Sequence, residues 1–243
     1  TSWLVKWPRG RDTDRDRLVL RAEYLFARAL ETLGLDVCAG QWHHLEGSKP
    51  SLWLERFDRR SSPTGLERVP VESFYSLAGI TQPGAVMTHE AFLEAVREAL
   101  ARRGQLASLP ELTHELVRRD LVDVLLGNTD NHGRNRAVVR GAQLQLAPIY
   151  DLAPMVTDPE GITRSTRWRD HERGGRIDYP SVCRALDAWL GTEGTLEALR
   201  AFAKRLLVLP QLLHEAGLPE EVFDSPRVYL EELPETLDLM GLT

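Results

Sequence analysis

Short stretches of alternating apolar and polar residues mark the beginning of the chain, a pattern that is typical of β-strands. The stretch SWLVKW (2–7) alternates, is rich in aromatic residues and predicts a strand that carries Lys6 near its end. The stretches GQWHHLE (40–46) and SLWLERF (51–57) predict two further strands, and residues 47–50 (GSKP) predict the turn between them. The beginning of the chain is therefore expected to form a small sheet.

The spacing of the apolar residues changes to that of a helix between the first two strands. Over residues 18–34 the apolar positions recur on one face, Gly34 marks the end, and Glu23 lies inside the stretch. Residues 58–67 (DRRSSPTGLE) follow the third strand and combine charge with Ser, Pro and Gly. This composition predicts a linker at that point.

Helical spacing dominates after this linker. A short helix is predicted over residues 71–79, and a longer one over residues 88–104, whose first residue is a threonine suited to cap the N-terminus. A third helix is predicted over residues 108–127, with a capping box formed by Ser108 and Glu111.

Two short apolar stretches interrupt the helical pattern. RAVV (136–139) and QLQLAPI (143–149) predict a hairpin that places Asp151 directly after its second strand. Helical patterns return from about residue 180. The chain is therefore expected to form a small, β-rich lobe followed by a larger helical lobe, and clefts between lobes are common ligand sites.

Composition and charge exclude several classes of protein. With 42% hydrophobic and 27% charged residues, the chain has the composition of an ordinary soluble globular protein. A formal net charge of −6 argues against a protein that wraps nucleic acid, although residues 164–176 could form a local basic patch. Cys38 and Cys183 lie far apart, which fits free thiols in a reducing compartment, so we expect a cytoplasmic protein. No membrane span or signal peptide is visible.

A cluster of polar residues ends the third predicted helix. The stretch LLGNTDNHGRNRAVV (125–139) crowds short polar side chains after an apolar run, and such residues often only form a turn. Asp130 and Asn135 lie five positions apart, and Asp151 follows the predicted hairpin. Protein kinases place a catalytic Asp, an Asn and a metal-binding Asp in this order, with a strand Lys and a helix Glu upstream. Lys6 and Glu23 occupy those two places, so the joint order indicates phosphoryl transfer from ATP.

Several of these stretches also resemble those of the HipA-like serine/threonine kinases, which are toxins of bacterial toxin–antitoxin pairs. The resemblance is carried by WLVKWP, AEYLFARALETLGLDV, LWLERFDRR, LLGNTDNHGRN and LAPIYDLAP, and it extends from residue 3 to about residue 155. It implies an α+β, two-lobed fold like that of protein kinases. The small β-rich N-lobe is expected at residues 1–60, and the larger helical C-lobe at residues 61–243, with the catalytic loop at residues 127–135.

The resemblance also implies a role for each residue of the site. Asp130 is expected to be the catalytic base, Asn135 and Asp151 to bind Mg²⁺, and Lys6 to contact phosphate, oriented by Glu23. The other residues that it places at the nucleotide are Glu55, Arg56 and Phe57, whose backbone forms the hinge that meets adenine, and His132, Gly133, Arg134 and Tyr150. We assign His132 to positioning.

The chain departs from the family in two places. The glycine-rich phosphate loop, which carries a regulatory serine, comes before the strand of Lys6, and TSWLV contains no glycine. We therefore expect the natural protein to begin earlier, with a Gly- and Ser-containing segment whose phosphorylation tunes activity and which affects ATP affinity more than residues 156–180 do. Residues 156–180 differ from the familiar family members, and we interpret them as a solvated loop; the alternative is a surface for a protein substrate or partner.

The leading hypothesis is a Mg²⁺/ATP-dependent protein serine/threonine kinase that inhibits growth as a toxin. The resemblance implies an aminoacyl-tRNA synthetase as the class of substrate. It also implies an antitoxin with a helix-turn-helix domain as the partner. The chain would then be associated with DNA only indirectly, through that antitoxin.

Three alternatives remain open at this point. A small-molecule kinase of the aminoglycoside type uses a similar set of Asp, Asn and Asp. A non-catalytic nucleotide-binding or DNA-tethered regulatory module is a second alternative, although all the kinase residues are present and the net charge is acidic. A metal nuclease would need more ligands than Asp130, His132 and Asp151 supply.

Overall fold

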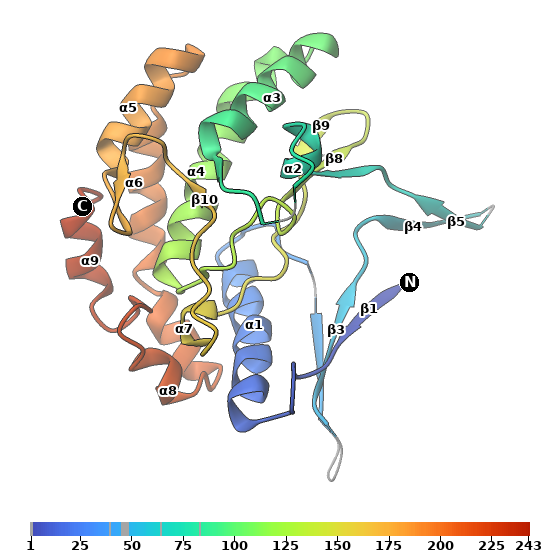
Figure 1. Ribbon diagram of the computed structural model, residues 1–243, viewed down its shortest axis with the longest axis vertical. Helices are drawn as coiled ribbons and strands as arrows, with labels where there is room; N and C mark the ends of the chain where they lie inside the picture. Colours follow the sequence, from blue (N-terminus) through green and yellow to red (C-terminus); the bar gives the residue numbers. More distant parts are fainter. Residues whose placement is uncertain (1, 39, 45–48, 64, 83) are drawn as a thin grey trace.

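The computed structural model shows two lobes on either side of one long helix (Figure 1). A small sheet lies on one side of helix α1, and most of the other helices lie on the opposite side. The structure describes residues 2–38, 40–44, 49–63, 65–82 and 84–243. The expected α+β, two-lobed, kinase-like architecture is confirmed.

The N-lobe sheet has three antiparallel strands in the order β1-β3-β2. Their bounds are Trp3–Lys6 (β1), Gly40–His43 (β2) and Ser51–Glu55 (β3). The three predicted strands are confirmed, while residues 45 and 46 of the second and residues 47 and 48 of the predicted turn lie outside the described residues. Leu52 and Leu54 of β3 are buried against Leu20 of α1 and Cys38, because alternate residues of a strand face one side.

Helix α1 (Asp14–Thr32) joins the two lobes. It begins with a capping box, in which Thr13 and Asp16 bond each other's backbone N–H groups. Its buried residues Phe26 and Leu30 pack into the main hydrophobic core that the C-lobe helices form. The strand that carries Lys6 and the helix that carries Glu23 are therefore tied to the larger lobe through one rigid element.

The predicted linker at 58–67 is wrong. Strands β4 (Arg59–Ser62) and β5 (Gly65–Arg68) form an antiparallel hairpin there, which projects outward from the two lobes in Figure 1. Every described residue of β5 is exposed. Neither face of the hairpin is buried, so its sequence lacks the apolar alternation by which a strand is usually detected.

The first C-lobe helices follow this hairpin. The short predicted helix at 71–79 is divided between strand β6 (Val71–Ser73) and helix α2 (Phe74–Leu77). Strand β7 (Met87–Thr88) leads into helix α3 (His89–Arg102), and the predicted N-cap is confirmed, since the Thr88 hydroxyl accepts from the Ala91 N–H. 

Helix α4 (Leu109–Leu125) begins differently from the prediction. The capping box of Ser108 and Glu111 is wrong, because Ser108 has helical backbone angles and makes no side-chain capping bond. A turn of 3-10 helix (Leu106–Ser108) precedes α4 and continues directly into it. The chain therefore enters α4 already coiled, and the serine does not occupy the extended conformation of an N-cap.

The predicted hairpin at the end of α4 is confirmed. Strands β8 (Ala137–Arg140) and β9 (Leu144–Leu146) pair with each other, and β6 extends the sheet on the other side of β8. Asp151 lies five residues after β9, as expected. This hairpin carries the chain from the polar loop at residues 127–135 back toward the N-lobe.

Residues 156–180 are not a solvated loop, so that interpretation is wrong. Strand β10 (Thr166–Arg167) pairs in parallel with β7, and β11 (Glu172–Arg173) pairs with β12 (Arg176–Ile177). The indole of Trp168 is buried in the main core. The possible basic patch at 164–176 begins with Arg164, which is largely buried between two carboxylates and is not part of a surface patch.

The C-terminal part is helical, as predicted. Its helices are α5 (Tyr179–Leu190), α6 (Thr195–Leu206), α7 (Leu209–Glu215), α8 (Glu220–Phe223) and α9 (Leu233–Leu239). Among the described residues, no helix combines the length and the apolar character that a membrane crossing requires.

Candidate active site

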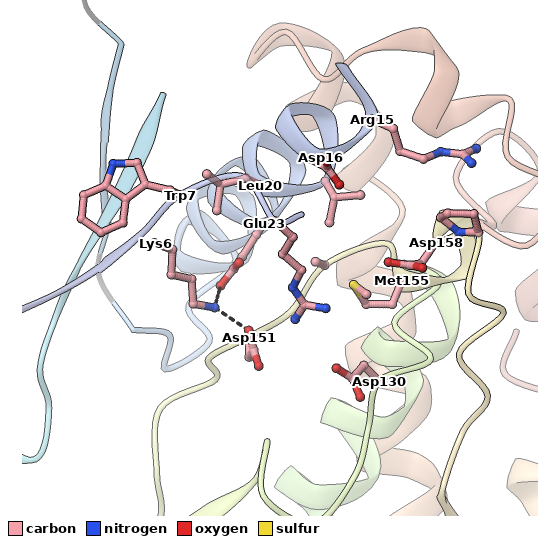
Figure 2. A pocket seen from close by; sticks show the side chains of 14 residues that line it. Lys6, Trp7, Arg15, Asp16, Leu20, Glu23, Asp130, Asp151, Met155 and Asp158 are labelled. Carbon is pink, nitrogen blue, oxygen red and sulfur yellow. Dashed lines mark hydrogen bonds and ion pairs between the residues drawn. The ribbon is translucent and has the colours of Figure 1, made fainter. Parts of the chain in front are cut away.

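Lys6, Glu23 and Asp151 meet between the two lobes (Figure 2). The Lys6 Nζ lies 2.6 Å from Glu23 Oε1 and also donates to Asp151 Oδ1. The three residues come from β1, α1 and the segment after β9, so residues 145 positions apart in the chain share one ammonium group. The predicted partnership of Lys6 and Glu23 is present in this geometry.

The charge of Lys6 is stabilised by its two partners. Burial alone lowers the pKa of Lys6, but the carboxylates of Glu23 and Asp151 outweigh burial and raise that pKa above its ordinary value. The amine therefore remains an ammonium group at neutral pH. A fixed cation in this cleft is suited to hold an anionic ligand such as a phosphate.

Asp151 has an unusual backbone conformation. Its φ is +59°, in the left-handed region that non-glycine residues rarely adopt. The preceding residue is held in place, since the Tyr150 hydroxyl donates to the Arg134 carbonyl oxygen at 2.8 Å. Strain of this kind persists only where surrounding contacts maintain it, and it is common at functional sites.

The loop at residues 127–135 is held by bonds within itself. The Asn135 Nδ2 donates to the Asp130 carbonyl oxygen at 2.8 Å, and the Asn135 N–H donates to the His132 carbonyl oxygen at 2.9 Å. His132 Nδ1 accepts from the Arg134 N–H at 3.3 Å, and His132 Nε2 lies 3.6 Å from Asp130 Oδ1. These contacts hold Asp130 and His132 next to each other within the loop, and the positioning role of His132 stays a prediction.

A cavity of about 290 Å³ gathers four of the predicted residues. Lys6, Glu23, Asp130 and Asp151 all line it. The remaining lining residues are Trp7, Arg9, Arg15, Asp16, Val19, Leu20, Ala153, Met155, Asp158 and Pro159. The cavity thus joins the lysine and its carboxylate partners to the proposed base.

The predicted hinge lies at the end of β3. The Glu55 carbonyl oxygen accepts from the Cys38 thiol at 3.1 Å, and the Arg56 N–H donates to the Ser2 carbonyl oxygen at 2.9 Å. The ring of Phe57 stacks on that of Tyr150 with the centroids 5.6 Å apart. The structure therefore brings Phe57 and Tyr150 together from the two lobes, while the Arg56 N–H is already bonded within the N-lobe.

Gly133 lies in close contact with two side chains, Tyr75 and Met87. A Cβ at this position would lie 2.4 Å from a ring carbon of Tyr75 and 2.7 Å from the Met87 sulfur. Tyr75 is itself buried, and its hydroxyl donates to the Ala85 carbonyl oxygen. Only glycine allows the loop to lie this close to the core.

Two carboxylates of α4 were not predicted. Asp123 Oδ1 accepts from Asn128 Nδ2 at 2.9 Å, and its other oxygen contacts the guanidinium of Arg136. Burial, together with the nearby charges of Arg119 and Arg164, lowers the pKa of Arg136 to about 10. The two contacts fix Asn128 near the start of the polar loop and Arg136 directly after it.

Asp120, one turn earlier, anchors residues 156–180. Its Oδ1 lies 2.7 Å from the Arg164 Nη2 and 3.1 Å from the His89 Nε2, and its Oδ2 accepts from the Trp168 indole and the Tyr179 hydroxyl. The sequence signal for both residues is a pair of carboxylates three positions apart within the apolar run of a helix.

The oxygen ligands of the site fit Mg²⁺. The described residues hold no cluster of three or more His, Cys, Asp or Glu side chains that could bind a metal on their own. Mg²⁺ is commonly held by one or two carboxylates together with the phosphates of the substrate. Asp151 and the amide oxygen of Asn135, which the bond to Asp130 does not use, are oxygen donors of this kind.

Comparisons with known proteins agree with the two-lobed fold. A protein chain in the complex of HipA, HipB and operator DNA from the Shewanella oneidensis MR-1 toxin–antitoxin system is similar, with a TM-score of 0.68 and 18% identity over 99% of this chain and 60% of that chain. The Helicobacter pylori proinflammatory kinase CtkA is similar, with a TM-score of 0.50 and 14% identity over 96% of this chain and 91% of that chain. A search of curated proteins gave no match.

These likenesses show a kinase-like fold, and the chain spans about 60% of the length of the similar Shewanella chain. The decisive match is to a family model described as the HipA-like C-terminal domain, which covers residues 1–207. The expected membership is therefore confirmed, and the chain belongs to the HipA-like C-terminal domain family.

Proposed function

We propose that this chain is a Mg²⁺/ATP-dependent protein serine/threonine kinase of the HipA-like toxin type. The observation that carries the proposal is the meeting of Lys6, Glu23 and Asp151 in one cavity with Asp130. These groups come from distant parts of the chain, and the fold brings them to one ammonium group. Phosphoryl transfer uses such a lysine, a helix Glu, a base and a metal-binding Asp.

Each residue has a role in this reaction. Lys6, held by Glu23, binds the α- and β-phosphates of ATP, and the hinge of Glu55, Arg56 and Phe57 meets the adenine. Asp130 accepts the proton of the acceptor hydroxyl as its oxygen forms a bond to the γ-phosphorus. The bond between that phosphorus and the β–γ bridging oxygen breaks, and ADP leaves with the electron pair.

Asn135 and Asp151 are the residues that would hold Mg²⁺, which neutralises charge on the phosphates when it is bound. His132, Gly133, Arg134 and Tyr150 shape the nucleotide side of the loop through their mutual contacts. The hydrogen bond from Asn135 to the backbone of Asp130 couples the metal ligand to the base.

The biological setting is proposed from the family. The substrate would be a translation component such as an aminoacyl-tRNA synthetase, and the partner an antitoxin with a helix-turn-helix domain that brings the complex to DNA. The similar Shewanella chain was solved with HipB and operator DNA, which supports a partner of that kind. Phosphorylation of the substrate and binding of the antitoxin would both take place in the cytoplasm.

The test is transfer of label from γ-labelled ATP with Mg²⁺ to proteins of a cell lysate and to the chain itself. Asp130→Ala should lower the rate by about 10²–10⁴, because the base and the orientation of the hydroxyl are both lost. Asp224→Ala removes an exposed carboxylate outside the cavity and should leave the rate unchanged. Equal rates for Asp130→Ala and the wild type would refute the proposal, and labelling of kanamycin in place of protein would favour a small-molecule kinase.

A further inference from the structure

The cavity of the candidate active site covers one end of the proposed nucleotide site. Asp130 and Asp151 line it, whereas Phe57, Tyr150 and the other residues expected at the adenine do not. Under the proposed function, this is the end at which the γ-phosphate and the acceptor hydroxyl meet. A further side chain that binds phosphate here would therefore act on the group that is transferred.

Arg9 is a cation of this cavity that has no part in the roles proposed so far. It lines the cavity three positions after Lys6 and is exposed, so a ligand can reach its guanidinium. Burial raises the pKa of the Glu23 carboxyl, and the positive charges of Lys6 and Arg9 oppose that rise. Arg9 therefore lies close enough to the ion pair of Lys6 and Glu23 for its charge to act on it.

The turn that carries Arg9 is anchored to helix α1. The Asp12 N–H donates to the Arg9 carbonyl oxygen at 3.2 Å, and Gly10 within this turn has a φ of +56°. The Asp12 carboxylate accepts from Arg17 Nε at 3.0 Å and from Arg17 Nη2 at 3.1 Å. The turn leads from β1 to α1, so the backbone of Arg9 is held beside the two elements that supply the lysine and its Glu partner.

The carboxylates that line the cavity have donors other than Arg9. Two of the five bond the lysine, and a third belongs to the proposed base. Asp16 Oδ2 accepts from the Thr13 N–H at 2.8 Å. Asp158 Oδ1 accepts from the Glu160 N–H, also at 2.8 Å. Among the described residues the Arg9 side chain makes no hydrogen bond or ion pair, so its N–H groups remain available to a ligand.

A phosphate is the ligand that suits this arginine. A guanidinium bonds the oxygens of a phosphate in pairs. ATP would enter together with Mg²⁺ beside Asp151, and the metal ion offsets repulsion by the carboxylates of the cavity. An acidic side chain of a protein substrate would face the same carboxylates without a metal ion of its own. Arg15 also lines the cavity, but its side chain extends away from Lys6 in Figure 2, so Arg9 is better placed.

We propose that Arg9 binds the γ-phosphate of ATP and thereby distinguishes ATP from ADP. The proposal rests on the proposed function and adds to it the residue that recognises the transferred group. Lys6 holds the α- and β-phosphates, so the two cations divide the triphosphate between them. Negative charge on the γ-phosphate oxygens must be stabilised during transfer, and an arginine in contact with them contributes to this.

Nucleotide binding tests this role without any need for catalysis. Calorimetry with Mg²⁺ compares ADP with the β,γ-imido analogue of ATP, which carries a γ-phosphate but resists its transfer. Arg9→Gln should weaken binding of the analogue about tenfold and binding of ADP less than about twofold, because only the analogue loses a charged hydrogen bond. Arg11→Gln is the matched control: Arg11 lies exposed in the same turn, outside the cavity, and its loss should leave both affinities unchanged.

Arg9→Lys provides a second variant. It keeps the positive charge but loses the paired N–H groups, so its affinity for the analogue should lie between those of the wild type and Arg9→Gln. Three results would overturn the proposal. They are equal weakening of the analogue and ADP in Arg9→Gln, unchanged affinity for both nucleotides, and a loss in Arg11→Gln as large as that in Arg9→Gln.

The labelling assay separates this proposal from the proposed function. With γ-labelled ATP below saturation, Arg9→Gln should lower the rate of transfer by at least the roughly tenfold loss in binding. Discrimination between the analogue and ADP through Arg9, without any transfer of phosphate, would refute the kinase assignment and still support the γ-phosphate contact. Transfer by a chain whose preference for the analogue does not depend on Arg9 would refute the contact and leave the kinase assignment in place.

Discussion

Replacing Asp120 by Asn should destabilise the protein strongly, although the two side chains have almost the same shape. Arg164, Trp168 and Tyr179 donate to the carboxylate, and His89 Nε2 lies 3.1 Å from its Oδ1. An Asn side chain presents one NH₂ group in place of an oxygen, so the donors at that oxygen lose their acceptor. The Arg164 charge would also lose one of its two carboxylate partners among the described residues and keep Glu172.

The size of the expected loss in unfolding free energy follows from the burial of Asp120. Asp120 is fully buried, and breaking a buried ion pair from one side costs about 3–5 kcal/mol. For a chain of this length, each kcal/mol shifts Tm by about 2–4 °C, which gives a decrease of roughly 6–20 °C. Urea unfolding followed by circular dichroism measures the change in free energy, and calorimetry measures Tm.

Asp58→Asn is the matched control. Asp58 is likewise an ion-paired carboxylate, with Arg56 and Arg59 as its partners, but its side chain is 22% exposed. Ion pairs near the surface contribute about 0–1 kcal/mol, so the control should lower Tm by only a few degrees. Equal losses of stability in the two variants would refute the reasoning from burial.

The effect of Asp120→Asn should also depend on pH. Burial alone raises the pKa of Asp120, but Arg164 and His89 outweigh it and hold that pKa well below the ordinary value of 3.8. A depressed carboxyl pKa stabilises the fold above the pKa of the unfolded chain, and this stabilisation is lost as the pH falls below that value. The difference in unfolding free energy between wild type and variant should therefore narrow below about pH 4. A difference that widens in acid would contradict this assignment.

Three further predictions concern the candidate active site. Asp151→Ala should weaken binding of MgATP much more than binding of metal-free ATP, and equal losses in calorimetry would count against a metal-binding role. Gly133→Ala should destabilise the protein by about 1–3 kcal/mol through the clash with Tyr75, whereas Gly141→Ala, where a Cβ has room, should change the unfolding free energy little; urea unfolding of both decides. Burial raises the pKa of Cys38 to about 11, so iodoacetamide should alkylate it about a hundredfold more slowly than a free thiol at pH 7, and rapid alkylation of the folded chain, read by mass spectrometry, would contradict this.

The chemistry of the candidate active site could be predicted because its residues follow one order along the chain. The kinase pattern requires a strand lysine, a helix Glu and two later carboxylates, and the turns between them are marked by local signals. Lys6, Glu23 and Asp151 meet as that order implies. The roles of Asn135 and of the hinge residues remain predictions, because no nucleotide or metal contact tests them.

The features that the sequence did not reveal are a hairpin without a buried face and contacts between residues far apart in the chain. The hairpin of β4 and β5 has no buried face, and β10 exists because Thr166 pairs with Met87, which is distant in sequence. Residues 156–180 are rich in charge, which usually indicates solvent exposure. Here Arg164 is buried because Asp120 and Glu172 accompany it, and only the fold brings these three residues together.

Helix α4 connects the catalytic loop at residues 127–135 with residues 156–180. Asp120 and Asp123 lie three positions apart and so share one face of the helix. Asp120 holds residues 156–180, and Asp123 holds Asn128 at the start of the catalytic loop and Arg136 directly after it. Because both segments are fixed to the same helix, they cannot move apart without breaking a buried ion pair. A rigid helix that carries two such anchors can therefore keep Asp130 in place, although neither anchor lines the cavity of the candidate active site.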